Sequence, residues 1–322
     1  MIIVDWNQCV IAALFGSKIL SYNTQKDSTK KETIDEDLLR HIVFDMLRSY
    51  IVKFQKNNSA HTELVIACDG KNSWRKEVFP YYKANRTKSR QESPHDWSAI
   101  YGAINKIRDE IQEIGLYTVI HIDHTEADDI ISVLSKMCYE KEEPVVIVSS
   151  DRDFLQLQTY FNVAQWSPTK GIWLKEKEPV NYLIEHIIRG DSGDGIPSIF
   201  ADDDVFVNEE KRSPPVTKKR IDEWVDFVMQ KKTEMDCDKK IVNPTTKARF
   251  ERNKKIIDLT NDKLPTSIID SVLSVYETES KNNADNYSTV KSRFLQFLID
   301  NKMKEHIKVI EEFFFAQSIL DF

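Results

Sequence analysis

The chain has 322 residues, of which 41% are hydrophobic, 10% aromatic and 30% charged, and its net charge is −7. This length suits two domains, and the composition excludes a disordered chain. The acidic balance excludes a surface that is basic throughout, so any nucleic-acid-binding surface has to be a local one.

We expect neither a membrane-spanning helix nor an export signal. No apolar stretch reaches the roughly 18 residues of a membrane-spanning helix, and no basic and apolar leader precedes the first expected strand. The cysteines show no paired spacing; they are Cys9, Cys68, Cys138 and Cys237. We therefore expect a reduced, cytoplasmic protein.

The first half of the chain alternates strands and helices. Short apolar runs predict strands over 1–4, 63–68, 117–122 and 145–149. Helical spacing of apolar residues predicts helices over 7–20, 35–47, 96–114 and 126–140, with a polar loop over 21–33 and a short helix beginning near Asp153. Thr125 is the expected N-cap of the helix at 126–140. The alternation predicts an α/β fold with a mostly parallel central sheet and flanking helices.

The strand pattern fades beyond about residue 180. Helices are expected over 181–188, 218–231, 244–258, 266–275, 287–300 and 302–315. Residues 201–217 contain Pro214 and Pro215 and are expected to form a long mobile loop. We therefore predict an α/β domain over 1–180 and a helical domain over 181–322.

Acidic residues follow the expected strands. Asp5 and Asp69 each end a strand, Glu126 and Asp128 come shortly after a third, and Asp151 and Asp153 come directly after the fourth. In open α/β sheets, ligands bind beyond the carboxyl ends of the strands. Carboxylates gathered there repel one another unless a hard divalent cation such as Mg²⁺ neutralises them. The alternative for either pair alone is a helix N-terminus that favours acids through its dipole; Asp129 is expected to cap the helix or face solvent.

Two further segments stand out. Residues 71–92 form a basic segment in which Glu77 is the one acid before Arg90. A local basic segment beside a metal site suits a phosphodiester substrate. Asp191 and Asp194 lie in a glycine-rich turn; they are ordinary turn residues unless the turn approaches a ligand.

Four motifs in order carry a resemblance to the 5′ nuclease, or flap endonuclease, family. The segment from Trp74 to Arg86 (W-R-K-E-V-F-P-Y-Y-K-A-N-R) resembles the arch motif of that family. T-E-A-D-D at 125–129 and S-S-D-R-D at 149–153 resemble its two metal motifs. G-D-S-G-D-G-I-P at 190–197 resembles the start of its helix–three-turn–helix element. Several of these motifs are weak alone, but the ordered set is highly specific.

The resemblance implies a PIN-like nuclease domain with a basic arch at about 71–92, followed by a helical DNA-binding domain. It implies two magnesium ions, with manganese as an alternative, held by Asp5, Asp69, Glu126, Asp128, Asp151, Asp153, Asp191 and Asp194. The catalytic residues carried over are Arg75, Lys83, Asp128 and Asp151. The nucleic-acid-binding residues that we expect are Arg75, Lys76, Tyr82, Lys83, Arg86, Lys88, Arg90, Lys218, Lys219 and Arg220.

Some of these assignments have ordinary alternatives. Tyr81 and Tyr82 either stack on a terminal base or pack within the arch. Residues 218–220 either contact phosphates or form the solvated first turn of a helix. The chain also departs from the family pattern: Gly195 stands where the family usually has Asn, and an insertion replaces the usual glycine-rich hairpin. How the duplex backbone and any potassium ion are held there stays open.

The resemblance implies a magnesium-dependent 5′→3′ exonuclease and flap endonuclease that removes RNA primers from lagging-strand fragments during phage DNA replication, in the host cytoplasm. Its expected substrates are DNA and RNA–DNA hybrids with a 5′ end or flap. Its expected partners are a single-strand-binding protein and, through residues 317–322, a sliding clamp, with the enzyme itself a monomer. The alternative for 317–322 is a helix end packed on its own domain. The alternative functions are a PIN-type single-stranded ribonuclease and a non-catalytic, structure-specific DNA-binding protein.

Overall fold

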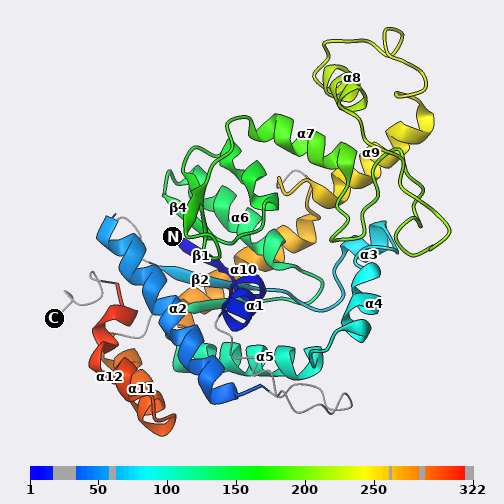
Figure 1. Cartoon of the computed structure of the whole chain (residues 1–322). Helices are drawn as coiled ribbons and strands as arrows, with labels where there is room; N and C mark the ends of the chain where they lie inside the picture. Colours follow the sequence, from blue (N-terminus) through cyan, green and yellow to red (C-terminus); the bar gives the residue numbers. More distant parts are fainter. Residues whose placement is uncertain (17–33, 58–62, 261–262, 283–286, 316–322) are drawn as a thin grey trace.

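The computed structural model describes residues 1–16, 34–57, 63–260, 263–282 and 287–315 (Figure 1). Its centre is a six-stranded sheet in the order β3-β2-β1-β4-β5-β6. The strands are β1 (Ile2–Asp5), β2 (Leu64–Cys68), β3 (Thr118–His121), β4 (Val145–Val148), β5 (Val163–Ser167) and β6 (Ile172–Leu174). Only the β5–β6 pair is antiparallel, which confirms the expected mostly parallel sheet. β5 and β6 were not predicted from the sequence.

Both faces of the sheet are buried, which explains the continuous apolar runs of its central strands. Ile2 and Val4 of β1 face one hydrophobic cluster, and Ile3 faces the other. Val4 pairs with Ile66 of β2 and with Val148 of β4. This register brings the carboxyl ends of three strands to the same edge of the sheet.

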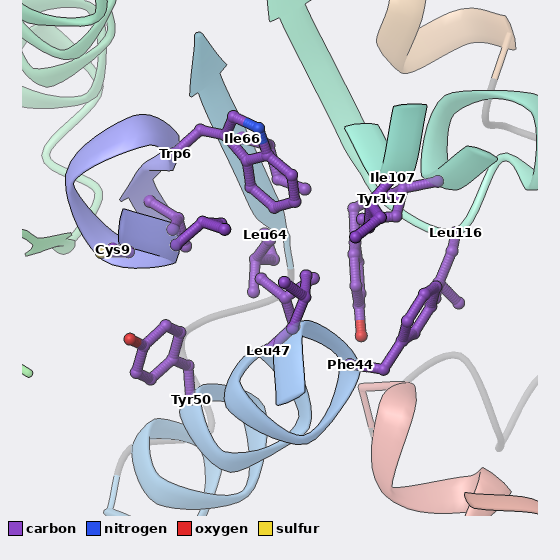
Figure 2. Packing of buried hydrophobic residues seen from close by; sticks show 14 of the residues in the cluster. Trp6, Cys9, Phe44, Leu47, Tyr50, Leu64, Ile66, Ile107, Leu116 and Tyr117 are labelled. Atoms are coloured by element: carbon purple, nitrogen blue, oxygen red, sulfur yellow. The ribbon is translucent and has the colours of Figure 1, made fainter. Parts of the chain in front are cut away.

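One face is covered by α1 (Trp6–Gly16), α2 (Glu36–Asn57) and α5 (Trp97–Ile114). Figure 2 shows Trp6 and Cys9 of α1 and Leu47 and Tyr50 of α2 around Leu64 of β2. The other face is covered by α6 (Ala127–Glu140) and α10 (Thr266–Asn282). The chain between β2 and α5 leaves the sheet as an arch, which contains α3 (Arg75–Val78) and α4 (Asn85–Glu92) (Figure 1).

Beyond the sheet, a third hydrophobic cluster joins α7 (Pro179–Arg189), α8 (Lys218–Val228) and α9 (Pro244–Ile257). α11 (Tyr287–Asp300), α12 (Lys304–Lys308) and the 3-10 helix η2 (Ile310–Phe313) return to the first half of the chain. The Tyr117 hydroxyl donates to the Phe313 carbonyl at 3.1 Å, and Phe44 stacks on Phe294. The domain boundary at 180 stays a prediction, and residues 264–315 share the hydrophobic clusters of the first half.

The predicted elements differ from the structure in a few places. The N-cap of α6 is Glu126 rather than Thr125, because the Asp129 carboxylate accepts the Glu126 backbone N–H at 2.9 Å. The prediction of one helix over 302–315 is wrong, because this segment forms two separate elements, α12 and η2. A 3-10 helix, η1, spans Asp153–Thr159 as expected, and residues 201–217 contain neither helix nor strand.

Some predictions fall outside the described residues, namely the loop at 21–33, the end of the first helix at 17–20 and the peptide 317–322. Among the helices that the structure describes, none has the length and apolar character needed to cross a membrane.

Candidate active site

The strand ends bring three predicted carboxylates to the base of the site. Asp5 ends β1, is only 6% exposed, and accepts the Ser149 hydroxyl at 2.8 Å. Asp69 follows β2 and accepts the Asn7 amide at 2.8 Å and the Ala127 backbone N–H at 3.0 Å. The second contact ties the end of β2 to the first turn of α6, where Asp128 lies.

The turn after β4 places the next two acids. The Ser149 hydroxyl accepts the Asp151 N–H at 3.0 Å, and the Asp151 carboxylate accepts the Asp153 N–H at 3.0 Å. Gln165 of β5 is fully buried and donates to the carbonyls of Ser149, at 3.0 Å, and of Asp151. Gln165 therefore supports this turn, although the sequence pattern did not predict its strand.

The strand-end carboxylates are poorly neutralised by the protein. Burial, with the charge of Asp69, raises the pKa of Asp5 to about 7, and burial, with the charge of Asp151, raises the pKa of Asp153 to about 7. Burial and Asp151 also hold the pKa of Asp128 well above its usual value. Within the described ranges, neither lysine nor arginine forms an ion pair with Asp5, Asp69, Asp128 or Asp151.

On the arch side, Glu126 is surrounded by donors instead. It accepts hydrogen bonds from Lys83 Nζ at 2.6 Å, the Tyr82 hydroxyl at 2.7 Å and Arg75 at 3.2 Å. Burial alone would raise the pKa of Glu126, but the charges of Lys83 and Arg75 outweigh burial and lower it. Asp194 is similarly placed, with the Tyr82 hydroxyl at 2.9 Å and Arg86 as an ion-pair partner.

Arg75 lies deeper than expected. Its side chain is 2% exposed and forms a two-pronged ion pair with Asp129, at 2.8 and 3.1 Å. Its Nε donates to the Ile256 carbonyl of α9 at 2.9 Å. Arg75 therefore holds α3 against α6 and α9, and the predicted contact with a phosphate would require this buried ion pair to open. Asp129 caps α6 as expected but does not face solvent.

The remaining predicted nucleic-acid contacts divide into two sets. A cavity of about 600 Å³ is lined by Asp69 and Glu126 together with four predicted cations, Lys76, Lys83, Arg86 and Arg90. Tyr82 is 2% exposed and packs within the arch, whereas Tyr81 is partly exposed. The other cations lie elsewhere: Lys88 pairs with Glu209, and Lys218, Lys219 and Arg220 begin α8, which Figure 1 shows far from the sheet.

The glycine-rich turn docks on the arch. The Lys83 backbone, with a φ of 57°, donates its N–H to the Asp194 carbonyl at 2.7 Å. The Asn85 amide donates to the Ser192 carbonyl at 2.8 Å. Gly195 has a φ of +69°, and a Cβ there would lie 3.0 Å from the side-chain Oδ1 of Asn85. A glycine at 195 thus leaves room for Asn85 of the arch.

His186 of α7 is a site residue that the sequence reasoning missed. Its ring nitrogens lie 3.5 Å from an Asp153 carboxylate oxygen and 3.6 Å from one of Asp191. The nearby His186 imidazole lowers the pKa of Asp191. The available signal was a histidine in the last turn of an expected helix, directly before the motif at 190–197.

The donor set suits divalent metal ions. Asp5 is buried, Asp128 and Asp153 are half-buried, and Asp69 and Asp151 are exposed. Among the described residues, none of the five has a lysine or arginine as ion-pair partner, and hard cations prefer such oxygen ligands. Asp151, Asp153 and Asp191 also line a cavity of about 500 Å³. The residues that could hold metal are therefore Asp5, Asp69, Asp128, Asp151, Asp153 and Asp191, with Glu126 and Asp194 already engaged by the arch.

Two family models match the chain. The 5′-3′ exonuclease, N-terminal resolvase-like domain matches residues 2–182, and the T4 RNase H, C terminal model matches residues 179–313. Among curated proteins, the ribonuclease H of Enterobacteria phage T4 is 30% identical over 253 residues, which cover 77% of this chain and 80% of that protein.

Other relatives match over about half of their length. A 5′-3′ exonuclease of Buchnera aphidicola is 29% identical over 49% of this chain and 54% of its own. The flap endonuclease Xni of Shewanella denitrificans is 31% identical over 43% of this chain and 54% of its own. The solved structure of the T5 D15 protein with metal ions aligns with a TM-score of 0.56 at 18% identity, covering 88% of this chain and 97% of that one. That similarity concerns the fold.

Proposed function

The chain belongs to the 5′-3′ exonuclease family and is a nuclease, and from this premise we propose that it is a magnesium-dependent 5′→3′ exonuclease and flap endonuclease on DNA and RNA–DNA duplexes. One observation carries the proposal. Carboxylates that have no lysine or arginine partner among the described residues gather at the ends of three parallel strands, next to a cavity lined by cations. The first set suits metal ions and the second suits a phosphodiester.

Different residues of the chain would hold the metal ions and stabilise the phosphate. Asp5, Asp69, Asp128 and Asp151 would hold one magnesium ion, and Asp153 and Asp191 would contribute to the second. Bound there, the two ions would supply an activated water and stabilise the attacking and leaving oxygens. Lys83, fixed by Glu126 and 20% exposed, would present a positive charge to the phosphate without reorganising.

The arch cavity would receive the 5′ end or flap. Lys76, Arg86 and Arg90 line it and would contact successive phosphates. The exposed Lys218 and Lys219 on α8 would contact the duplex farther away. A T5 flap endonuclease of the same fold has been solved in a complex with DNA and metal ions, which supports this class of ligand.

We further propose that the enzyme removes RNA primers from lagging-strand fragments, because the phage T4 relative is a ribonuclease H. A single-strand-binding protein and a sliding clamp remain proposed partners, and a monomer the proposed state. The cytoplasm is the proposed compartment, since all four cysteines are free and buried.

A digestion experiment tests the proposal. Purified protein is given a 5′-labelled flap, a nicked RNA–DNA duplex and single-stranded RNA, each with magnesium and with chelator. Cleavage of the first two substrates only with magnesium supports the proposal. Preference for single-stranded RNA would favour a PIN-type ribonuclease, and binding without cleavage would favour a non-catalytic DNA-binding protein. An Asp151→Asn variant controls for a contaminating nuclease.

A further inference from the structure

One histidine lies among the acidic ligands of the site. His186 faces Asp153 through one ring nitrogen and Asp191 through the other, at 3.5 and 3.6 Å. One ligand atom from each of the three residues lies within 4.8 Å of the others. One imidazole offers one nitrogen to an ion, so only one of the two contact distances involves the ligand nitrogen. An ion about 2.0–2.2 Å from all three ligand atoms would draw the more distant carboxylate closer.

The surroundings of His186 support a ligand role. Its Nδ1 atom is buried and forms no hydrogen bond in the part of the chain that the structure describes. The side chain as a whole is 13% exposed and lines the cavity of about 500 Å³ together with Asp151, Asp153 and Asp191. The cavity is roomy enough for an ion that keeps some of its waters.

We propose that His186 is a nitrogen ligand of the second metal position, which it forms with Asp153 and Asp191. This inference rests on the proposed metal-dependent function. Magnesium prefers an all-oxygen set, whereas imidazole suits transition metals. The second position therefore favours Mn²⁺ over Mg²⁺, while the strand-end position, made of carboxylates alone, discriminates less between them.

In the alternative arrangement, His186 does not contact the metal. A protonated His186 would form ion pairs with Asp153 and Asp191, and a metal would then bind through carboxylates only. The two arrangements differ in one observable, since only the first places a nitrogen on the ion.

Electron spin echo modulation of the Mn²⁺-loaded protein measures that observable directly. We expect modulation from a coordinated nitrogen in the wild type, its loss in His186→Gln, and its retention in His121→Gln, which changes an exposed histidine at the end of β3. Calorimetric titration should show one Mn²⁺ weakened about tenfold or more in His186→Gln, with Mg²⁺ affinity changed less. His186→Asp should shift the preference of that position back toward Mg²⁺.

The outcomes separate the inference from the function. Two bound Mn²⁺ ions without nitrogen modulation, in a protein that cleaves flaps, would overturn the ligand role and leave the function standing. Modulation that persists in His186→Gln would also overturn it. Nitrogen modulation in a protein that cleaves nothing would support the ligand and contradict the nuclease. Absence of any bound Mn²⁺ would contradict both.

Discussion

The carboxylates of the site form two neighbouring groups. One group is paired with lysine and arginine side chains, and the other has no such partner among the described residues. On the arch side, Glu126, Asp129 and Asp194 contact Arg75, Lys83 and Arg86. At the strand ends, Asp5 and Asp128 have raised pKa values, because burial and neighbouring acids disfavour their charged forms. The first group is neutralised by cations of the protein, whereas we propose that a metal ion neutralises the second.

We expect this difference to separate residues that stabilise the fold from residues that serve the proposed reaction. Removing one partner of a buried ion pair is strongly destabilising, because it leaves the other charge buried and uncompensated. A carboxylate whose pKa is raised by burial and by neighbouring acids costs stability, and such carboxylates are typical of functional sites. Neutralising one member of each group should therefore change stability in opposite directions.

Asp151→Asn should have the largest effect on cleavage. It removes a proposed metal ligand that has no lysine or arginine partner within the described ranges. Metal ions supply several kcal/mol of transition-state stabilisation, so kcat should fall about a thousandfold or more. Without metal, the melting temperature should stay the same or rise, because one repelling charge is lost. Calorimetry and a flap assay check both.

Asp123→Asn is the matched control for that variant, since Asp123 is an exposed acid just beyond β3. It should cleave as the wild type does. Near-normal turnover of Asp151→Asn in magnesium, or a lower melting temperature without metal, would contradict the division into two groups.

Arg75→Met should have the largest effect on stability. It leaves Asp129 buried with no cation in direct contact, which costs about 3–5 kcal/mol in free energy of unfolding. Urea unfolding in chelator measures this. Lys76→Met, one residue along on the same short helix but exposed, should change the free energy by less than about 0.5 kcal/mol. Equal losses in the two variants would show that burial of Arg75 does not matter.

Arg75 also shows what the sequence could and could not predict. The first four strands, and the acids that follow them, can be found from local apolar runs, so Asp5, Asp69, Asp128 and Asp151 could be predicted to lie together. The burial of a side chain depends on residues that are far away in the sequence. Arg75 and Lys76 read alike in a basic segment, but the partners of Arg75 lie 54 and 181 residues away, at Asp129 and Ile256.

The missed elements share that cause. β5 is short and contains the polar Gln165, whose burial makes sense only once it donates to the turn after β4. His186 can be recognised as a site residue only when the fold places both Asp153 and Asp191 next to it. Each depends on a contact between segments that local pattern does not connect.

Lys83→Ala tests the boundary between the two groups. Lys83 contacts Glu126 but also lines the arch cavity, so it can act on the substrate while Arg75 continues to neutralise Glu126. Removing a fixed charge of this kind costs about a hundredfold in kcat. Single-turnover cleavage should fall by that amount, with flap affinity within about threefold of the wild type.

Lys76→Ala is the control for Lys83→Ala, because Lys76 lines the same cavity without an ion pair to the described acids of the site. It should weaken binding more than cleavage. If Lys83→Ala instead loses affinity and keeps kcat, Lys83 is a phosphate anchor and belongs with Lys76.

The smallest expected effect concerns the pH dependence of stabilisation by magnesium. The pKa values of Asp5 and Asp153 are raised from 3.8 to about 7, chiefly by burial. The unfolded chain loses these protons near its lower pKa, whereas the metal-free fold keeps them. Their contribution to stability is therefore complete at low pH and is lost as the pH rises through 7.

Magnesium replaces those protons, so the rise in melting temperature on adding it should be larger at pH 8 than at pH 5.5, by at least about 2 °C. Asp5→Asn should reduce this difference, because it removes one of the two protons that magnesium displaces. Asp123→Asn should leave the difference unchanged. An equal rise at both pH values would mean that the strand-end acids are already ionised in the metal-free fold, and the contrast with the arch-side group would then lie in geometry rather than in charge.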